Sequence, residues 1–381
     1  MTTPNSWTRR AFTQFSATAI GALFVPRTNA FGRTQDDWGG YADATIIDAL
    51  ASPGPFNVPN RTGSPLSEVM LANARESGIT AVNVTVNAGG AGHAAYDNTF
   101  REIGYWEREI DAHPNILTKI TNVSDLEEAK RRNRLGLIFG FQDAGMLEGD
   151  IGRLEIFHNH GVRIIQLTYN LRNGIGDGCL EPGNAGLSMF GRNAVERMNE
   201  LGILVDVSHC GKRTTSDAIE ASTRPIAATH SGCNGVYRHP RNKDDEDLRA
   251  LAEKGGVVGI YMMPFLNADG PATSEHMIQH IEHAIQVCGE DHVGVGSDNS
   301  ITPTVADDNY RRTLQAFAAE RQRQRIGAPR EYELLFVTDL NNPRRMEMLG
   351  NALIRRGHAV SRVEKILGGN FKRLFQETWK P

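Results

Sequence analysis

Two histidines have surroundings that favour metal chemistry. His209 ends the segment DVSH and His230 lies in the segment ATHS, so each has a serine beside it. Neutral imidazole is the usual protein ligand of zinc and similar ions. Two such residues from neighbouring strands can bind one ion, and Asp298 or the amide oxygen of Gln142 could complete a set of three ligands. The pair therefore predicts a metal ion that activates a water molecule for attack on a carbonyl carbon.

Further polar residues follow other apolar segments. Asp298, in GVGSD, is predicted to be catalytic, accepting and returning a proton as general base and acid. Tyr169 and Asn170 end the segment QLTYN, and Gln142 ends FGFQ. We expect Tyr169 to take part in catalysis, and Gln142 and Asn170 to bind the substrate.

Arg241, in HPRN, follows His230 closely enough to reach the same site. A guanidinium there would bind a substrate carboxylate through two parallel hydrogen bonds. The alternative is a structural salt bridge with the acidic run DDED that follows at residues 244–247. The sequence leaves both possibilities open.

These residues must be positioned by the elements that carry them, and the chain supplies a regular series of such elements. Helix-like stretches such as SEVMLANARESG and RNAVERMNELG separate eight almost continuously apolar runs, as expected for strands covered on both faces. The runs are TIIDAL, ITAVNVTV, LGLIFGFQ, VRIIQLTYN, ILVDVSH, PIAATHS, GGVVGIYMM and HVGVGSD. Eight repeats predict an α/β fold, a single (β/α)8 TIM-like barrel whose active site lies at the carboxyl ends of the strands. No G-x-G-x-x-G follows the first run, so a dinucleotide-binding sheet is not favoured.

The composition restricts the partners. The chain of 381 residues is 40% hydrophobic and 23% charged, with a net charge of −4, which is ordinary for a soluble globular protein. No long basic block is present, so we expect no nucleic-acid partner. The four cysteines show no C-x-x-C spacing, and the sequence leaves disulfides and assembly as a homodimer open.

The first 30 residues have the three parts of an export signal. Arg9 and Arg10 precede a short apolar run, FSATAIGALFV, and small residues close it at Ala30. The paired arginines indicate the twin-arginine route. We therefore expect a signal peptide at residues 1–30, a barrel domain at residues 31–381, a periplasmic location, and no stable membrane span in the mature protein.

The central block of the chain resembles the membrane (renal) dipeptidase family of metallopeptidases, which are of the amidohydrolase type. The resemblance is carried by GRNAVERMNELGILVDVSHCGKRTTSDAIEASTRPIAATHSGCNGVYRHPRN, with GVGSD and the late ILGGNFKRLF. It implies a (β/α)8 barrel that hydrolyses dipeptides and related amides with two zinc ions. It also implies that His209 and His230 bind one zinc, that Arg241 holds the substrate carboxylate, and that Asp298 transfers protons.

The same resemblance shows departures from the family pattern. The first strand of the family reads Asp-Gly-His-x-Asp, whereas this chain reads DALAS, with Leu50 and Ser52 at the two ligand positions. Gln142 stands where a glutamate bridges the two ions, and Tyr169 stands where a histidine faces the substrate. A second dication beside Leu50 would lack a compensating carboxylate. We therefore predict one zinc ion at most, on His209 and His230, or none.

These observations favour a metallodipeptidase-like hydrolase that acts on a dipeptide or small amide. An alternative is a divergent enzyme on the same barrel that is not a peptidase and modifies a periplasmic metabolite with one metal or none. A binding protein that uses a former active site is less favoured, since Arg241 and Asp298 are present. The long connection at residues 301–335 is a candidate lid over the site.

Overall fold

Parallel strands form the centre of the structure, a computed structural model that describes residues 38–54, 65–87 and 93–379. Eight of them pair side by side in the order β1-β3-β5-β6-β7-β8-β9-β10, and β4 pairs with β5 beside this path. A separate pair, β2 and β11, is also parallel. The strands are β1 Ile47–Asp48, β2 Ala51–Ser52, β3 Ala81–Thr85, β4 Leu117–Ile120, β5 Leu135–Phe141, β6 Val162–Gln166, β7 Leu204–Asp206, β8 Ala227–Ser231, β9 Val257–Ile260, β10 Val293–Val295 and β11 Asn299–Ser300.

The two ends of this strand path approach each other. The backbone nitrogen of Ala49, after β1, donates to the carbonyl oxygen of Val295 in β10 at 2.9 Å. Just beyond them, β2 pairs with β11. The sheet is therefore a nearly closed barrel, and the predicted (β/α)8 architecture is confirmed.

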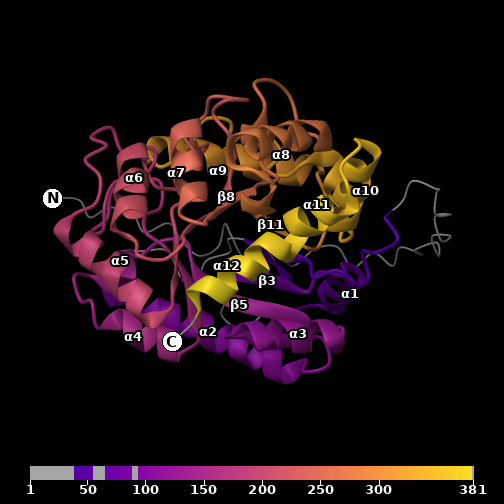
Figure 1. The fold of residues 1–381 in the computed structure, drawn as a ribbon, viewed down its shortest axis with the longest axis horizontal. Coiled ribbons are helices and arrows are strands. Elements are labelled where there is room, and N and C mark those ends of the chain that lie inside the picture. The colour runs from indigo at the N-terminus through magenta and orange to yellow at the C-terminus, as the bar shows by residue number, and fades with distance from the viewer. Residues whose placement is uncertain (1–37, 55–64, 88–92, 380–381) are drawn as a thin grey trace. The chain divides into compact units, whose positions relative to one another are not determined.

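Helices follow most of the strands and surround them (Figure 1). They are α1 Glu68–Glu76, α2 His93–Ala112, α3 Val123–Arg131, α4 Arg153–Asn159, α5 Met189–Leu201, α6 Lys212–Ala221, α7 Asp245–Glu253, α8 Ser274–Cys288, α9 Asp308–Arg323, α10 Arg345–Arg355, α11 Val360–Glu364 and α12 Asn370–Thr378. Short helical turns are η2 Gly145–Leu147, η3 Pro264–Leu266, η4 Glu290–His292, η5 Thr338–Leu340 and η6 Lys365–Gly369.

Local sequence signals set several helix ends. The Ser188 side chain accepts a hydrogen bond from the backbone nitrogen of Gly191 and so caps the start of α5. At the other end of α5, Gly202 adopts a left-handed conformation with φ 72°, which a residue with a Cβ adopts at a cost. These caps fix the start and the end of α5, and β7 begins two residues after Gly202.

Buried apolar residues of the strands pack in a cluster with α12. This cluster gathers one residue from each of seven strands of the path around Phe371 and Phe375 of α12, and all of them are fully buried. Figure 1 shows α12 running across the strands, and α12 contacts β9, β10 and α3. The strand residues of this cluster are Ile47, Ala81, Ile138, Ile164, Leu204, Ala227 and Val257.

The sequence analysis did not predict β4. Its four residues, LTKI, include a lysine and are only half apolar, so the segment lacks the continuous apolar run of the other strands. The predicted signal peptide at residues 1–30 lies outside the described residues. Within the described ranges, no helix is both long and apolar enough to cross a membrane.

Candidate active site

Four of the predicted site residues lie together at the carboxyl ends of neighbouring strands. Asn170 and Tyr169 follow β6, His209 follows β7, and His230 lies in β8. Nδ1 of His209 lies 2.6 Å from Oδ1 of Asn170, and the Tyr169 ring stacks on the His209 ring with 4.2 Å between centroids. Nε2 of His209 lies 3.1 Å from Nε2 of His230. The strands therefore bring these side chains into one cluster, in which Asn170, His209 and His230 are buried and Tyr169 is partly exposed.

Glycine at position 178 allows this cluster to form. A Cβ on Gly178 would overlap the carbonyl oxygen of Tyr169. Without it, the backbone of the 178–180 segment approaches both neighbouring strand ends: Cys179 N donates to His209 O, and Leu180 N donates to Asn170 O, each at 2.8 Å. The segment thus fixes the backbone on both sides of the histidine.

The hydrogen-bond partners set the tautomer of each histidine. The Asn170 amide nitrogen donates to the carbonyl of Ile326 at 2.9 Å, which leaves its oxygen to accept the proton on Nδ1 of His209. The hydroxyl of Thr229 donates to Asp206 at 2.5 Å, so it accepts from Nδ1 of His230 at 2.9 Å.

Both Nε2 atoms are consequently unprotonated and point their lone pairs at each other. Burial, followed by the nearby Arg241 guanidinium, holds the pKa of His209 and of His230 well below the usual range, so neither ring is readily charged. Two facing lone pairs at 3.1 Å repel unless a cation is shared between them. This donor set fits two of the ligands of one metal ion.

No group of three or more His, Cys, Asp or Glu side chains placed to hold an ion occurs in residues 38–54, 65–87 and 93–379. This argues against Asp298 as a third ligand of the histidine pair. The Leu50 and Ser52 side chains are buried, and the Ser52 hydroxyl accepts a hydrogen bond from Gly54 N at 3.2 Å.

Asp48, the acidic residue of the first strand, has a different partner. Its Oδ2 pairs with the guanidinium of Arg345 at 3.0 Å, and both side chains are almost fully buried. The sequence analysis left open whether Asp48 adjusts to bind a metal. The ion pair with Arg345 supplies its counter-charge from within the chain.

Arg241 reaches the same cluster from the loop after β8. Its Nη1 donates to the carbonyl of Ser208 at 2.7 Å, and its Nη2 lies 3.4 Å from the carbonyl of His230. The side chain is buried, and its guanidinium lies over the Tyr261 ring at 5.8 Å. Neutral carbonyls therefore orient this cation at the site.

The acidic run at residues 244–247 makes other contacts. Asp244 pairs with Lys212 at 2.9 Å, as Glu246 does at 3.2 Å. Asp245 pairs with His283 at 2.8 Å. In the described part of the chain, no ion pair joins this run to Arg241, so the predicted alternative of a structural salt bridge is not what the structure shows.

Asp298 follows β10 and has an unusual backbone and side chain. Its φ of 59° is left-handed, which costs a non-glycine residue about 1–2 kcal/mol. Its backbone nitrogen donates to the carbonyl of Leu50 at 2.8 Å. Burial raises the pKa of its carboxyl to about 7, although the nearby Arg241 lowers it in part. Oδ1 is buried and has no hydrogen-bond partner among the described residues.

Gln142 lies at the end of β5, next to this cluster along the sheet. Its amide nitrogen donates to the hydroxyl of Thr85 at 2.8 Å, and its backbone carbonyl accepts from Gln166. The structure thus shows the Gln142 side chain bonded to the neighbouring strand β3.

The segment after β10 and β11, at residues 301–335, covers the cluster. The carbonyl of Ile326 accepts from Asn170, and the carbonyl of Pro329 lies 2.9 Å from Nε2 of His239. Arg321 lies over the Tyr169 ring at 5.7 Å and pairs with Glu331 through two contacts at 2.7 and 3.0 Å. Burial raises the pKa of the Tyr169 hydroxyl.

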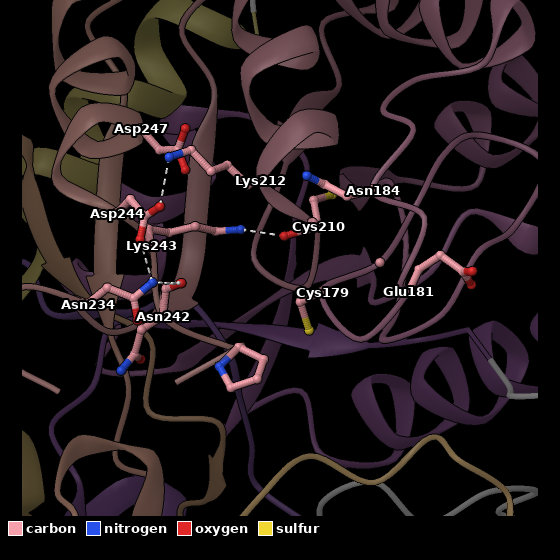
Figure 2. A pocket seen from close by; sticks show the side chains of 13 residues that line it. Cys179, Glu181, Asn184, Cys210, Lys212, Asn234, Asn242, Lys243, Asp244 and Asp247 are labelled. Carbon is pink, nitrogen blue, oxygen red and sulfur yellow. Dashed lines mark hydrogen bonds and ion pairs between the residues drawn. The ribbon is translucent and has the colours of Figure 1, made fainter. Parts of the chain in front are cut away.

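A cavity of about 210 Å³ adjoins the site on the side of the His209 segment (Figure 2). Lys243 is buried there and donates to the carbonyl of Cys210 at 2.8 Å and to the hydroxyl of Thr215 at 3.1 Å. Burial lowers the pKa of its amine. Cys179 lines the cavity too, and its thiol contacts Asn170 at 3.5 Å. None of the predicted site residues lines this cavity.

Sequence reasoning missed several residues of the site. Asp206 holds both Ser208 and Thr229 and so orients His230 indirectly. Its position in DVSH, three residues before His209, was the available signal. Arg321 and Arg345 come from distant segments, and no local pattern identifies them.

The fold and the place of the site define a (β/α)8 barrel that carries its site at the carboxyl ends of the strands. The chain belongs to the membrane dipeptidase family, peptidase family M19, whose family model matches residues 55–320. It is therefore a member of a metallodipeptidase family, as the sequence resemblance predicted.

Individual relatives agree with this assignment. The chain is 27% identical over 289 residues to the dipeptidase tcpJ of Claviceps purpurea, a match that covers 75% of this chain and 61% of that protein. It is 31% identical over 211 residues to an uncharacterized dipeptidase of Schizosaccharomyces pombe, covering 54% of this chain and 52% of that one. The chain thus spans only part of the length of these curated relatives.

Solved structures share the fold. An amidohydrolase from Pseudomonas aeruginosa superimposes with a TM-score of 0.75 at 29% identity, over 89% of this chain and 98% of that chain. A metallo peptidase from Rhodobacter sphaeroides, liganded with a phosphinate mimic of the dipeptide L-Ala-D-Ala, gives 0.71 at 18% identity, over 88% and 99%. At that identity the second likeness concerns the fold alone.

Proposed function

We propose that this chain hydrolyses the amide bond of a dipeptide or a similarly small amide that ends in a free carboxylate. The observation that carries the proposal is Arg241, a buried cation that two backbone carbonyls hold beside the histidine pair. A guanidinium has five N–H donors, so donors remain for a bidentate carboxylate. Membership of the dipeptidase family supports this substrate class.

Asp298 is the proposed general base and acid. Its buried carboxyl, with a pKa of about 7, is populated in both protonation states near neutral pH. Its Oδ1, which has no hydrogen-bond partner among the residues that the structure describes, is the atom at which a proton would be taken up and returned. Tyr169 and Asn170 orient His209, and Gln142 and Asn170 are the proposed polar contacts for the substrate.

His209 and His230 are the proposed ligands of a single zinc ion, through their two Nε2 atoms. Such an ion would supply a Lewis acid next to the scissile carbonyl. The residues Asp48, Leu50 and Ser52 do not fit a second ion, because the Asp48 carboxylate is paired with Arg345 and the buried Leu50 and Ser52 side chains carry no charge.

A comparison of substrates tests this proposal directly. The exported form, supplied with zinc, is assayed on a panel of dipeptides and on the same dipeptides with the terminal carboxylate converted to an amide. We expect the carboxylates to be preferred by at least tenfold in kcat/KM, and Arg241→Met to abolish that preference. Arg238→Met is the matched control, because Arg238 lies in the same loop and is exposed. No turnover of any dipeptide would refute the proposal.

A second candidate function is favoured by the incomplete ligand set. Among the described residues, the histidine pair has no third His, Cys, Asp or Glu ligand, and a divergent enzyme that is not a peptidase would need none. Such an enzyme would modify a small periplasmic metabolite, with Tyr169, Gln142 and His209 as acid, base and hydrogen-bonding groups. Full dipeptidase activity that a chelator abolishes would exclude it.

We also propose that the chain is exported to the periplasm by the twin-arginine route. The paired arginines before the apolar run support this location. Replacing Arg9 and Arg10 by lysine should retain the protein in the cytoplasm, whereas Arg27→Lys, beyond the run, should leave export intact. Cell fractionation distinguishes the two results.

A further inference from the structure

We propose that Arg345 is a positioning residue for Asp298, holding the segment after β10 in the geometry that the site requires. The inference deepens the proposed function, on which it rests only for the acid and base role of Asp298. It is carried by the contacts of one buried guanidinium.

Arg345 begins α10, and its guanidinium contacts residues on both sides of Asp298. Nη2 donates to the hydroxyl of Ser297 at 2.9 Å and lies 3.5 Å from the carbonyl of Asn299. Nη1 donates to the carbonyl of Ser300 at 2.6 Å. Arg345 thus contacts the residue before Asp298 and the two residues after it, and so holds the backbone in between.

The same guanidinium ties this segment to the first strand. Nη2 pairs with Oδ2 of Asp48 at 3.0 Å, while Oδ1 of Asp48 accepts from the backbone nitrogen of Ser297 at 2.7 Å. Asp48 and Arg345 therefore act together on Ser297, the residue before Asp298. Both side chains are almost fully buried, so water competes little for these bonds.

Asp298 needs such support because its backbone is left-handed, at φ 59°. Strained backbone conformations persist only where several contacts from the surrounding structure hold them in place. The chain from the end of β1 through β2 supplies part of that support, since Leu50 O accepts from Asp298 N and Ser52 O accepts from Ile301 N, each at 2.8 Å. Arg345 adds to these backbone bonds the hydrogen bonds of its side chain to Ser297 and Ser300.

The test compares Arg345→Met and Arg345→Lys with a matched control, Arg163→Met. Arg163 is also a guanidinium that binds backbone carbonyls, those of Thr121, His158 and Val162, but it lies near the amino end of β6. The pKa of the Asp298 carboxyl is measured by NMR on protein with labelled aspartate, with Asp298→Asn to assign its signal. This measurement does not depend on turnover.

We expect Arg345→Met to shift the pKa of Asp298 by more than half a unit. A rise would show that Asp48, now without its cation, acts on Asp298, and a fall would show that the carboxyl has moved toward water; either supports the proposal. Arg163→Met should leave the pKa unchanged. Where turnover is measurable, kcat should fall at least tenfold with KM within threefold, because Arg241 is untouched.

Arg345→Lys restores a cation opposite Asp48 but cannot make all the guanidinium bonds. It should fold even if Arg345→Met does not, and it should recover only part of kcat. An Asp298 pKa that is unchanged in both Arg345 variants would overturn the proposal. A wild-type protein without dipeptide turnover would instead refute the proposed function, and the pKa comparison would still decide the role of Arg345.

Discussion

At the scale of single residues, Asp298 combines features that are costly to fold and useful in a reaction. One oxygen of its carboxyl is buried and has no hydrogen-bond partner in the described part of the chain, and burial raises the pKa of the carboxyl to about 7. Groups with strongly shifted pKa values are concentrated at functional sites. Arg241 and Arg321 lower this pKa, whereas Asp48 and Glu331 raise it, so the balance depends on four charged neighbours.

A raised carboxyl pKa makes the folded protein less stable as the pH increases. The folded chain keeps its proton up to about pH 7, while the unfolded chain releases it near the ordinary value of 3.8. The contribution of this carboxyl to the free energy of unfolding is therefore fully present at acidic pH. It falls as the pH rises from about 4 to about 7, by on the order of 4 kcal/mol at most. We predict that Asp298→Asn unfolds at a higher temperature than wild type at pH 8 but not at pH 4. Thermal unfolding of the exposed-site control Asp269→Asn should show no such difference.

The same carboxyl should govern the pH dependence of turnover. A general base acts in its unprotonated form, so kcat/KM should rise with pH through about 7. Asp298→Asn should lower kcat by roughly a hundredfold or more and abolish this rise. A pH profile that is flat between pH 5 and 8 in the wild type would contradict the role assigned to Asp298.

At the scale of elements, α9 and the loop after it lie over Tyr169 and Asn170. The segment is anchored by the bidentate ion pair between Arg321 and Glu331, both largely buried. Removing one partner of such a pair leaves an uncompensated buried charge, which costs about 3–5 kcal/mol. Removing both partners costs less.

We therefore predict that Arg321→Met destabilises the protein more than the double variant Arg321→Met with Glu331→Gln. Urea unfolding of wild type, both single variants and the double variant gives the coupling as a double-mutant cycle. The exposed pair of Arg356 and Glu275 is the control and should show a coupling below about 1 kcal/mol. Equal destabilisation in the Arg321 single and double variants would show that the pair does not anchor the segment.

The barrel was predictable from the sequence because most of its strands are continuously apolar, a pattern that needs no knowledge of distant contacts. The histidine pair was predictable because its residues lie at the ends of such strands. Their tautomers were not, since these depend on Ile326 and Asp206. The ion pair of Asp48 with Arg345 joins residues 297 positions apart, and no local pattern encodes such a contact.

At the scale of the whole molecule, the closure of the barrel brings the first and last strands together. This closure places Asp48 next to Ser297 and gives α10 access to both. The Asp48 carboxylate on the first-strand side of the site is thus already neutralised by Arg345, whereas on the His209 side the lone pairs of the two Nε2 atoms face each other. The histidine side of the site therefore favours a metal ion, and the first-strand side does not.

This asymmetry predicts the metal content of the protein. A dication beside Asp48 would face the Arg345 guanidinium and the buried Leu50 side chain, so its desolvation would not be compensated. Purified protein supplied with zinc should bind no more than one ion per chain by mass spectrometric metal analysis. His209→Ala and His230→Ala should each lose that ion, whereas His113→Ala, outside the site, should retain it. Two tightly bound ions per chain would mean that Asp48 exchanges Arg345 for a metal, and would contradict both the single-ion site and the role of Arg345 as its counter-charge.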